Sequence, residues 1–139
     1  MAFRKIGVVG AGTMGNGIAQ AFAQAGFEVV MSDVAQAALD RALATISGSY
    51  DRLIKKEKMT AEQKAAALSR IKTATDLAAL KDSDLIIEAA TENLDLKLKI
   101  FRQLDDLAKP DAVIASNTSS ISITKLAAST KRPDHFLDG

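Results

Sequence analysis

Apolar residues recur along the chain in two alternating spacings, short continuous runs and longer stretches with a helical period. Strands are predicted where the apolar runs are short: 5–10, 28–33, 70–75, 83–90 and 111–115. Helices are predicted where apolar residues return every three or four positions: 13–26, 35–57, 60–69, 95–108 and 122–130. This alternation predicts an α/β fold with a mostly parallel sheet and a helical insertion after the second strand.

Local signals suggest the faces and ends of several elements. We expect one face of the first helix to pack inward: Ile18, Ala21, Phe22 and Ala25. The segment TAEQ at 60–63 fits a capping box, in which a threonine and a glutamine satisfy free backbone N–H groups at a helix start. The tail RPDHFLDG at 132–139 is typical of a domain boundary or a broken-off end.

Composition limits the possible partners. The 139 residues suit one domain, 1–139, and 47% hydrophobic residues suffice for a substantial core. Eighteen Lys and Arg against 17 Asp and Glu form no basic footprint for nucleic acid. With no cysteine and one histidine, disulfides, thiolate metal sites and multi-histidine metal clusters are excluded. No apolar run is long enough for a membrane span or a secretory signal, so we expect a soluble cytoplasmic protein.

The motif GAGTMG at 10–15 fits the pattern G-x-G-x-x-G between a predicted strand and a predicted helix. Gly10 permits a tight turn, Gly12 lets the backbone approach a pyrophosphate, and Gly15 lets the helix pack closely on the strand. The helix N-terminus offers free N–H groups and a partial positive charge to phosphates. We therefore predict a dinucleotide site that includes Thr13 and Met14; an ordinary glycine-rich turn is the alternative.

Asp33 ends the second predicted strand, where a carboxylate is placed to accept hydrogen bonds from a ribose diol. Its charge would repel the 2′-phosphate of NADP, and no arginine follows it in DVAQAA, so the sequence favours NAD. FAD is a weaker option, because flavoproteins share this opening unit. The alternative is that Asp33 only caps the next helix.

The stretch ASNTSSIS at 115–122 follows a predicted strand and carries five hydroxyl side chains. Ligands gather at the carboxyl ends of strands in open α/β sheets, and a serine hydroxyl there can hydrogen-bond a reacting oxygen. The alternative is a simple N-cap for the helix predicted at 122–130. Four hydroxyls in SNTSS are more than capping requires.

Charged residues elsewhere support both functional and ordinary interpretations. Glu92, past the strand at 83–90, is placed either to hold a ribose or to complement a helix dipole. Glu88 lies inside that strand pattern, so we expect it to be partly buried and to need a partner. Lys55, Lys56 and Lys58 form a basic cluster that either binds phosphate or is a solvated helix end.

Taken in order, GAGTMG with Asp33, IIEAATEN at 86–93 and SNTSSISIT at 116–124 resemble the NAD-dependent L-3-hydroxyacyl-CoA dehydrogenases. The resemblance covers essentially the whole chain, and the last two motifs are more specific than the first. It implies a Rossmann-type, doubly wound NAD-binding domain. The implied reaction interconverts (S)-3-hydroxyacyl-CoA and 3-ketoacyl-CoA, with 3-hydroxybutyryl-CoA and acetoacetyl-CoA as the expected substrate pair.

The same resemblance implies roles for individual residues. Glu92 and Lys97 match residues near the nicotinamide end of the cofactor, and Asn117 matches one near the nicotinamide ribose. Ser49 and Lys56 match contacts to coenzyme A. Ser119 matches the catalytic serine that hydrogen-bonds the reacting oxygen of the substrate.

The family's catalytic histidine lies in a motif that this chain does not reach, so the catalytic role is not transferred to His135. The resemblance therefore implies a cofactor domain without its helical C-terminal domain. We expect the fragment alone to be inactive, and to self-associate through a face that the missing domain would cover. The alternatives are a hydroxyacid or imine reductase of another family and a non-catalytic nucleotide-binding module.

Overall fold

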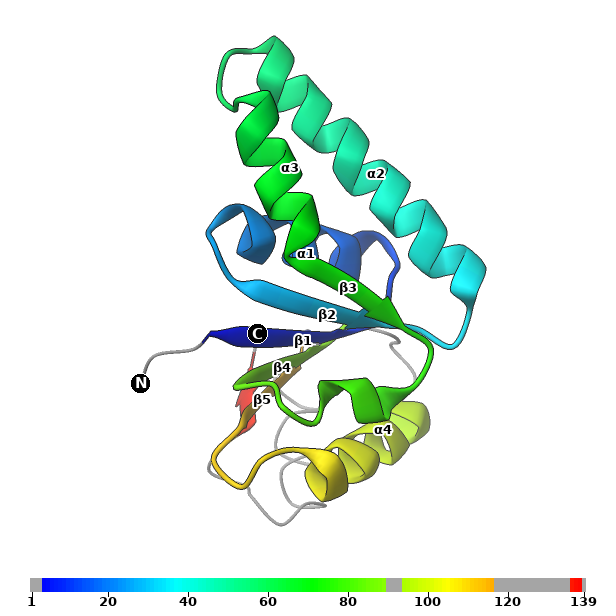
Figure 1. The fold of residues 1–139 in the computed structure, drawn as a ribbon. Coiled ribbons are helices and arrows are strands. Elements are labelled where there is room, and N and C mark those ends of the chain that lie inside the picture. The colour runs from blue at the N-terminus through cyan, green and yellow to red at the C-terminus, as the bar shows by residue number, and fades with distance from the viewer. Residues whose placement is uncertain (1–3, 90–93, 117–135, 139) are drawn as a thin grey trace.

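The computed structural model describes residues 4–89, 94–116 and 136–138 (Figure 1). Its six parallel strands lie in the order β3-β2-β1-β4-β5-β6. The strands are β1 Lys5–Val9, β2 Glu28–Ser32, β3 Ile71–Ala74, β4 Leu85–Glu88, β5 Val113–Ser116 and β6 Phe136–Asp138. The helices are α1 Thr13–Gln24, α2 Gln36–Lys55, α3 Ala61–Ser69, the 3₁₀ helix η1 Leu77–Leu80 and α4 Leu94–Leu107. The predicted doubly wound fold is confirmed, as is the helical insertion, formed by α2 and α3.

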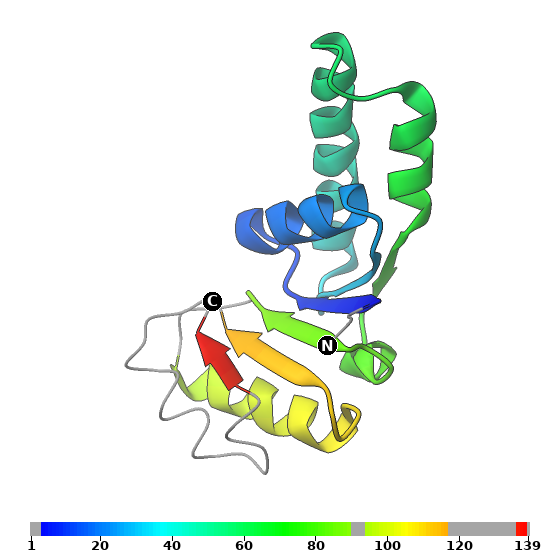
Figure 2. The ribbon, with the colours of Figure 1, turned by 90° about the vertical axis from the view of Figure 1, so that its left-hand side faces the viewer.

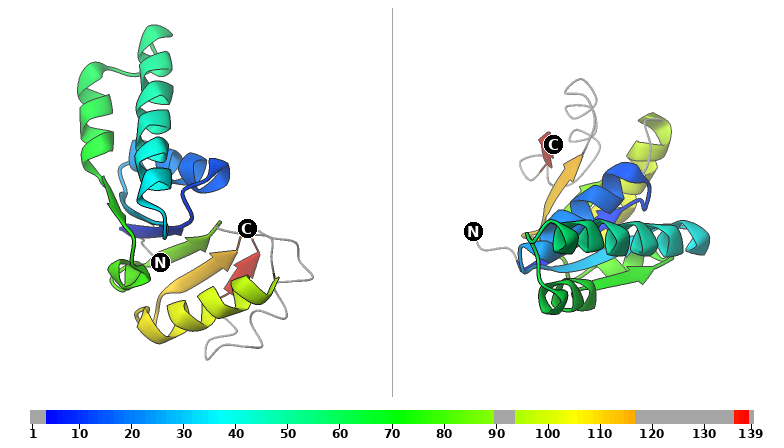
Figure 3. Two further views of the ribbon diagram at one scale, coloured as in Figure 1. Left: turned by 90° about the vertical axis from the view of Figure 1, so that its right-hand side faces the viewer. Right: turned by 90° about the horizontal axis from the view of Figure 1, so that it is seen from above.

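Helices cover both faces of the sheet. Helix α1 lies on the same side as α2 and α3, whereas η1 and α4 lie on the other side (Figures 1 and 3). One apolar cluster joins β1 and β2 to α1 and α2, and a second joins β4 and β5 to α4. Because both faces are covered, the central strands are apolar on both sides, which explains their continuous hydrophobic runs.

The buried face of α1 differs from the predicted one. Gly15, Ala19 and Ala23, spaced at i, i+4 and i+8, face inward, whereas Ala21 and Ala25 are exposed. These small residues allow the helix to lie directly on the sheet, and the larger Ile18 and Phe22 pack as partly buried side chains at the flanks. The prediction included the exposed Ala21 and Ala25 and overlooked the inward stripe of Gly15, Ala19 and Ala23.

Helices α2 and α3 project away from the sheet as a pair (Figure 2). Their attachment is polar as well as apolar: the buried Tyr50 hydroxyl donates to the carbonyl of Gln20 at 2.7 Å, and the Arg70 guanidinium donates to the carbonyl of Ala23 at 2.9 Å. Both acceptors lie in the last turns of α1, so the pair is fixed to that helix. The predicted capping box at the start of α3 is confirmed, with Thr60 and Gln63 as its partners.

The tail contains a short strand that the sequence did not suggest. Strand β6 pairs with β5 in parallel, with Phe136 opposite Ile114. Three residues carry too little periodicity to predict a strand, and its partner strand lies more than 20 residues earlier.

The helix predicted at 122–130 lies outside the described residues. No helix in the described ranges is long and apolar enough to cross a membrane.

Candidate functional site

The glycine loop joins β1 to α1 at the carboxyl edge of the sheet. Gly10 has a φ of 106°, a left-handed conformation that strongly favours glycine. Its N–H donates to the carbonyl of Ser32 at 2.7 Å, which ties the loop to the end of β2. The predicted tight turn is therefore present at the position that the fingerprint requires.

Gly15 and Gly12 differ in what surrounds them. A Cβ on Gly15 would lie 1.9 Å from the carbonyl oxygen of Gly10, so close helix–strand packing demands glycine there. A Cβ on Gly12 would meet no heavy atom of the described residues within 4 Å. Its φ of −75° also suits any residue. The fold does not require a glycine at this N-cap position of α1, so the open space beside it suits a ligand that approaches the backbone.

Asp33 follows β2 and organises the backbone on both sides of the cleft. Its Oδ2 accepts the N–H of Ala11 at 3.0 Å, and its Oδ1 accepts the N–H of Ala35 at 2.9 Å. The N-cap of α2 is Ala35, so Asp33 itself does not cap that helix. A carboxylate oxygen has two lone pairs, and each oxygen of Asp33 therefore retains capacity for a ribose hydroxyl.

A cavity of about 400 Å³ opens beside this loop. Gly10, Asp33 and Val34 line one side, and residues of α4 line the other: Leu96, Lys99, Ile100 and Gln103. The α4 residues were not suggested by the sequence, because nothing local links this helix to Gly10 and Asp33, which lie more than 60 residues earlier in the chain. A larger cavity of about 530 Å³ lies near the amino ends of the strands. We place the site at the smaller cavity, because ligands bind at the carboxyl ends in such sheets.

Met14, Val34 and Leu96 are the exposed large apolar side chains of the described residues, at 55%, 93% and 46% exposure. Val34 and Leu96 line the cavity beside the glycine loop, and Met14 lies in the first turn of α1. Thr13 is also exposed in that turn. Exposed apolar groups around a cleft are suited to a flat aromatic ligand such as a purine base.

A buried ion pair lies at the end of β4. The Lys97 ammonium, in the first turns of α4, donates to Oε1 of Glu88, and the two side chains are 1% and 0% exposed. The expectation that Glu88 is buried and needs a partner is confirmed. Glu88 is also the register partner of Val9, next to the glycine loop. The partner itself was not predicted, although Lys97 was singled out for another role.

Helix α2 carries the residues expected to contact coenzyme A. Ser49 is half-buried and Lys56, the C-cap residue, is exposed. Arg52, which the sequence did not suggest, lies between them and donates to the Ser49 hydroxyl at 3.0 Å. The spacing 49, 52 and 56 places the three residues on one face of the helix. That spacing is the signal that could have identified Arg52.

Four residues singled out from the sequence lie outside the described residues: Glu92, Asn117, Ser119 and His135. Within the described ranges, no group of three His, Cys, Asp or Glu residues is placed to hold a metal ion.

The family described as "3-hydroxyacyl-CoA dehydrogenase, NAD binding domain" matches residues 5–138. The chain belongs to this family. The 3-hydroxybutyryl-CoA dehydrogenase of Bradyrhizobium diazoefficiens is 52% identical over 134 residues, 96% of this chain and 46% of that protein. The enzyme of the same name from Clostridioides difficile is 45% identical, over 96% of this chain and 47% of that protein. The chain thus spans about half the length of these curated relatives.

Solved structures agree with the family. The crystal structure of (S)-3-hydroxybutyryl-CoA dehydrogenase from Ralstonia eutropha has a TM-score of 0.95 and 58% identity, covering 99% of this chain and 48% of that one. As a 3-hydroxyacyl-CoA dehydrogenase NAD-binding domain, the chain takes NAD as its cofactor. Its own geometry fits that ligand, because Gly12 leaves space at the start of α1 and Asp33 stands at the end of β2.

Proposed function

We infer that the protein carrying this domain interconverts (S)-3-hydroxyacyl-CoA and 3-ketoacyl-CoA, with 3-hydroxybutyryl-CoA and acetoacetyl-CoA as the substrate pair. The observation that carries this proposal is the open backbone at Gly12, followed by Asp33 at the end of β2, in a chain matched over residues 5–138. The names of the relatives supply the substrate class. Bound NAD supplies the hydride acceptor.

The cofactor-binding residues of this proposal follow the two halves of a dinucleotide. Gly10, Gly12, Thr13, Met14 and Gly15 form or flank the pyrophosphate loop, where the N–H groups of the first turn of α1 are free to bind phosphate. Asp33 accepts from the adenosine ribose, and its charge disfavours a 2′-phosphate. The proposal therefore specifies NAD rather than NADP.

The nicotinamide half would lie on the β4 side of the loop, where Glu92, Lys97 and Asn117 are the proposed contacts. This follows from the arrangement of a dinucleotide across the point where strand order reverses, here between β1 and β4. Ser119 is the proposed donor to the reacting oxygen of the substrate. Strand β5 ends at Ser116, so Asn117 and Ser119 follow a strand in the position where such sites are built.

Coenzyme A would bind along helix α2. Ser49 and Lys56 are joined in this proposal by Arg52, whose guanidinium already donates to Ser49. Coenzyme A carries a 3′-phosphate and a pyrophosphate, and an arginine fork binds phosphate oxygens in a bidentate manner. Three donors on one face of the helix, two of them exposed, would suit such a group.

We also infer that the protein forms homo-oligomers and acts in the cytoplasm. The resemblance to 3-hydroxyacyl-CoA dehydrogenases, whose helical C-terminal domain supplies the dimer contacts, supports the first point. A sequence without cysteine suits a reducing compartment. Light scattering tests the first of these points, and a monodisperse monomer would contradict it.

The experiment that tests the proposed function is a fluorescence titration of the chain with NADH and, separately, with NADPH. The chain has no tryptophan, so the nucleotide's own emission is read without overlap. We expect saturable binding of NADH, binding of NADPH at least about tenfold weaker because of Asp33, and a change in NADH affinity when acetoacetyl-CoA is added. Equal affinity for the two nucleotides, or binding of neither, would contradict the proposal.

A further inference from the structure

The Glu88–Lys97 pair stands in a place that is unfavourable for charge. Both side chains are buried, and the neighbouring Ile86 and Phe101 belong to the apolar cluster between the sheet and α4. Removing two ions from water costs more than an apolar pair of similar size would. Lys97 also lies near the N-terminus of α4, where the helix dipole opposes a positive charge. A contribution to the stability of the fold therefore does not explain why two charged residues occupy these buried positions.

The position of the pair points to the cofactor cleft. Glu88 is the last residue of β4 and the register partner of Val9, and the N–H of Ala89 donates to the Val9 carbonyl at 2.8 Å. Gly10 follows Val9 directly. The pair therefore lies where β1 and β4 diverge, the reversal point of strand order at which dinucleotides bind across the sheet.

The Lys97 ammonium has three N–H donors. Among the described residues, Glu88 is the acceptor for one of them. The adenosine half of the cofactor is assigned to the β2 side by Asp33, so the other half extends towards β4. Lys97 is 1% exposed, so its remaining donors reach that half only when binding of the nucleotide uncovers the ammonium.

We propose that Glu88 is a positioning residue for the nicotinamide half of the cofactor, acting through Lys97. The buried carboxylate accepts a hydrogen bond from the ammonium and fixes its direction, so that Lys97 is pre-organised before the nucleotide binds. The inference rests on the proposed function, since it requires a dinucleotide in the cleft. It adds Glu88, a residue with no direct contact to the ligand, to the set that determines NAD affinity.

The test compares two ligands on the 139-residue chain. NADH reports both halves of the site, and ADP reports the adenosine half alone. We expect Glu88→Gln to weaken NADH about tenfold and to change ADP less than twofold. Glu88→Asp keeps the buried charge but withdraws it by one methylene, so it provides a second variant if the first folds poorly. We expect a smaller loss for NADH in Glu88→Asp and again no change for ADP.

The double variant Glu88→Gln/Lys97→Met separates binding from stability. It removes both buried charges, so its melting temperature should recover relative to Glu88→Gln, whereas its NADH affinity should equal that of Lys97→Met alone. Asp84→Asn is the matched control, because it breaks a second carboxylate–lysine pair, with Lys109, at the opposite edge of the sheet. It should leave the ratio of NADH to ADP affinity unchanged.

Each contrary result has a distinct meaning. Equal weakening of NADH and ADP in the Glu88 variants would show a purely structural role and overturn the inference. Unchanged NADH affinity in a folded Glu88→Gln variant, or additive effects in the double variant, would overturn it as well. Failure of the unmodified chain to bind NADH would instead overturn the proposed function.

Discussion

The backbone N–H of Ala11 donates to Oδ2 of Asp33 at 3.0 Å, which ties the centre of the glycine loop to the end of β2. Asp33 also accepts from Ala35 through its other oxygen. The carboxylate therefore shapes the loop as well as the proposed ribose site. Its substitution should affect ligands that never touch it.

Asp33→Asn tests this double role. An asparagine has one acceptor oxygen and presents an NH₂ group to one of the two N–H donors, so the loop should loosen. We expect both ADP and 2′,3′-dideoxy-ADP to bind more weakly, by about three- to tenfold for the dideoxy ligand, equivalent to about 1 kcal/mol. Calorimetric titration measures both. If Asp33 acted on the ribose alone, the dideoxy ligand would bind equally well, or better because a negative charge is removed.

Gly12→Ala and Gly15→Ala should separate binding from folding. A methyl group on Gly15 would collide with the Gly10 carbonyl, and we expect a cost of about 3 kcal/mol, or a melting temperature about 10 °C lower. A methyl group on Gly12 meets no described protein atom, but it would stand where the proposed pyrophosphate approaches the backbone. Gly12→Ala should therefore stay within about 1 kcal/mol in stability and lose about 100-fold in NADH affinity. Full NADH affinity in Gly12→Ala would contradict the loop assignment.

Arg52→Ala should weaken coenzyme A binding by about fivefold, or about 1 kcal/mol, because the guanidinium is exposed and screened by solvent. Lys56→Ala should have a similar effect, and both losses should shrink as salt is added. Lys55→Ala is the matched control, since it removes the same charge from the adjacent position. Equal losses in all three variants would indicate a general attraction and no defined phosphate site.

Tyr50 is the only tyrosine of the chain, and the chain has no tryptophan, so absorbance of the tyrosinate reports this residue alone. Burial raises the pKa of Tyr50 above its usual 10.0, and the nearby positive charge of Arg70 opposes the shift. The neutral form is therefore favoured in the folded state, and its contribution to stability is lost as pH rises beyond 10. We expect the folded chain to ionise at higher pH than the urea-unfolded chain. Coincident titration curves would contradict the burial of this ring.

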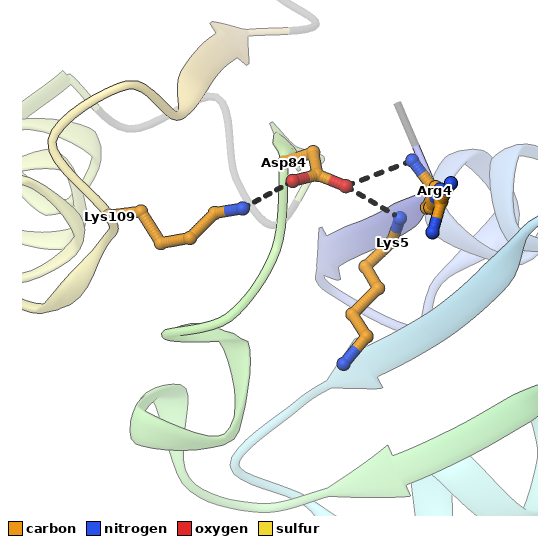
Figure 4. Close-up of polar contacts among 4 residues, drawn as sticks. All are labelled: Arg4, Lys5, Asp84 and Lys109. Atoms are coloured by element: carbon orange, nitrogen blue, oxygen red, sulfur yellow. Dashed lines mark hydrogen bonds and ion pairs between the residues drawn. The ribbon is translucent and has the colours of Figure 1, made fainter. Parts of the chain in front are cut away.

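Asp84 lies at the amino ends of β1 and β4, at the opposite end of these strands from the glycine loop (Figure 4). Its Oδ1 accepts from the Lys109 ammonium, and its Oδ2 accepts the N–H groups of Arg4 and Lys5 at 2.9 and 3.0 Å. The hydrogen bond from Lys109, followed by those from the two backbone groups, lowers the pKa of Asp84 from 3.8 to about 2. The ionised form is therefore favoured by folding.

A folded-state pKa below the unfolded value gives stability that is present above about pH 4 and is lost as pH falls towards 2. We expect Asp84→Asn to cost about 1 kcal/mol at pH 7, a value reduced by solvent screening of the partly exposed pair. The difference from the unmodified chain should shrink below about pH 4 and vanish only below about pH 2. Urea unfolding at pH 7, 4 and 2 measures it, and a difference that stays constant across this range would contradict the assignment.

Much of the fold was accessible from the sequence because the relevant signals are local. The strand and helix periods, the glycine loop and the capping box each depend on residues within a few positions of one another. The buried face of α1 was predicted only in part: Ile18 and Phe22 pack against the core, but Ala21 and Ala25 are exposed. The inward stripe of Gly15, Ala19 and Ala23 was missed, because close packing of the helix on the sheet favours small residues. Strand β6 was missed because backbone pairing with β5 creates it.

In the candidate site too, residues with local sequence signals were predicted, and residues that only tertiary packing brings in were not. Gly10, Gly12, Gly15 and Asp33 were found from one motif and its spacing, and the structure brings them to the same edge of the sheet. The α4 wall of the cavity was not found, because it approaches the loop only through the crossover after β4. The ligand-binding and catalytic roles proposed for all of the site residues remain predictions, and Glu92, Asn117 and Ser119 also lie outside the described residues.

The sequence by itself predicted the α/β architecture, the dinucleotide fingerprint and NAD as the cofactor, because periodicity, glycine spacing and charge are properties of short segments. Only the tertiary structure decided that Asp33 holds Ala11 and that Glu88 meets Lys97 in the interior. Both contacts join separate elements, and their strength depends on burial and on atomic distance. Those quantities exist only once the sheet has brought the elements together.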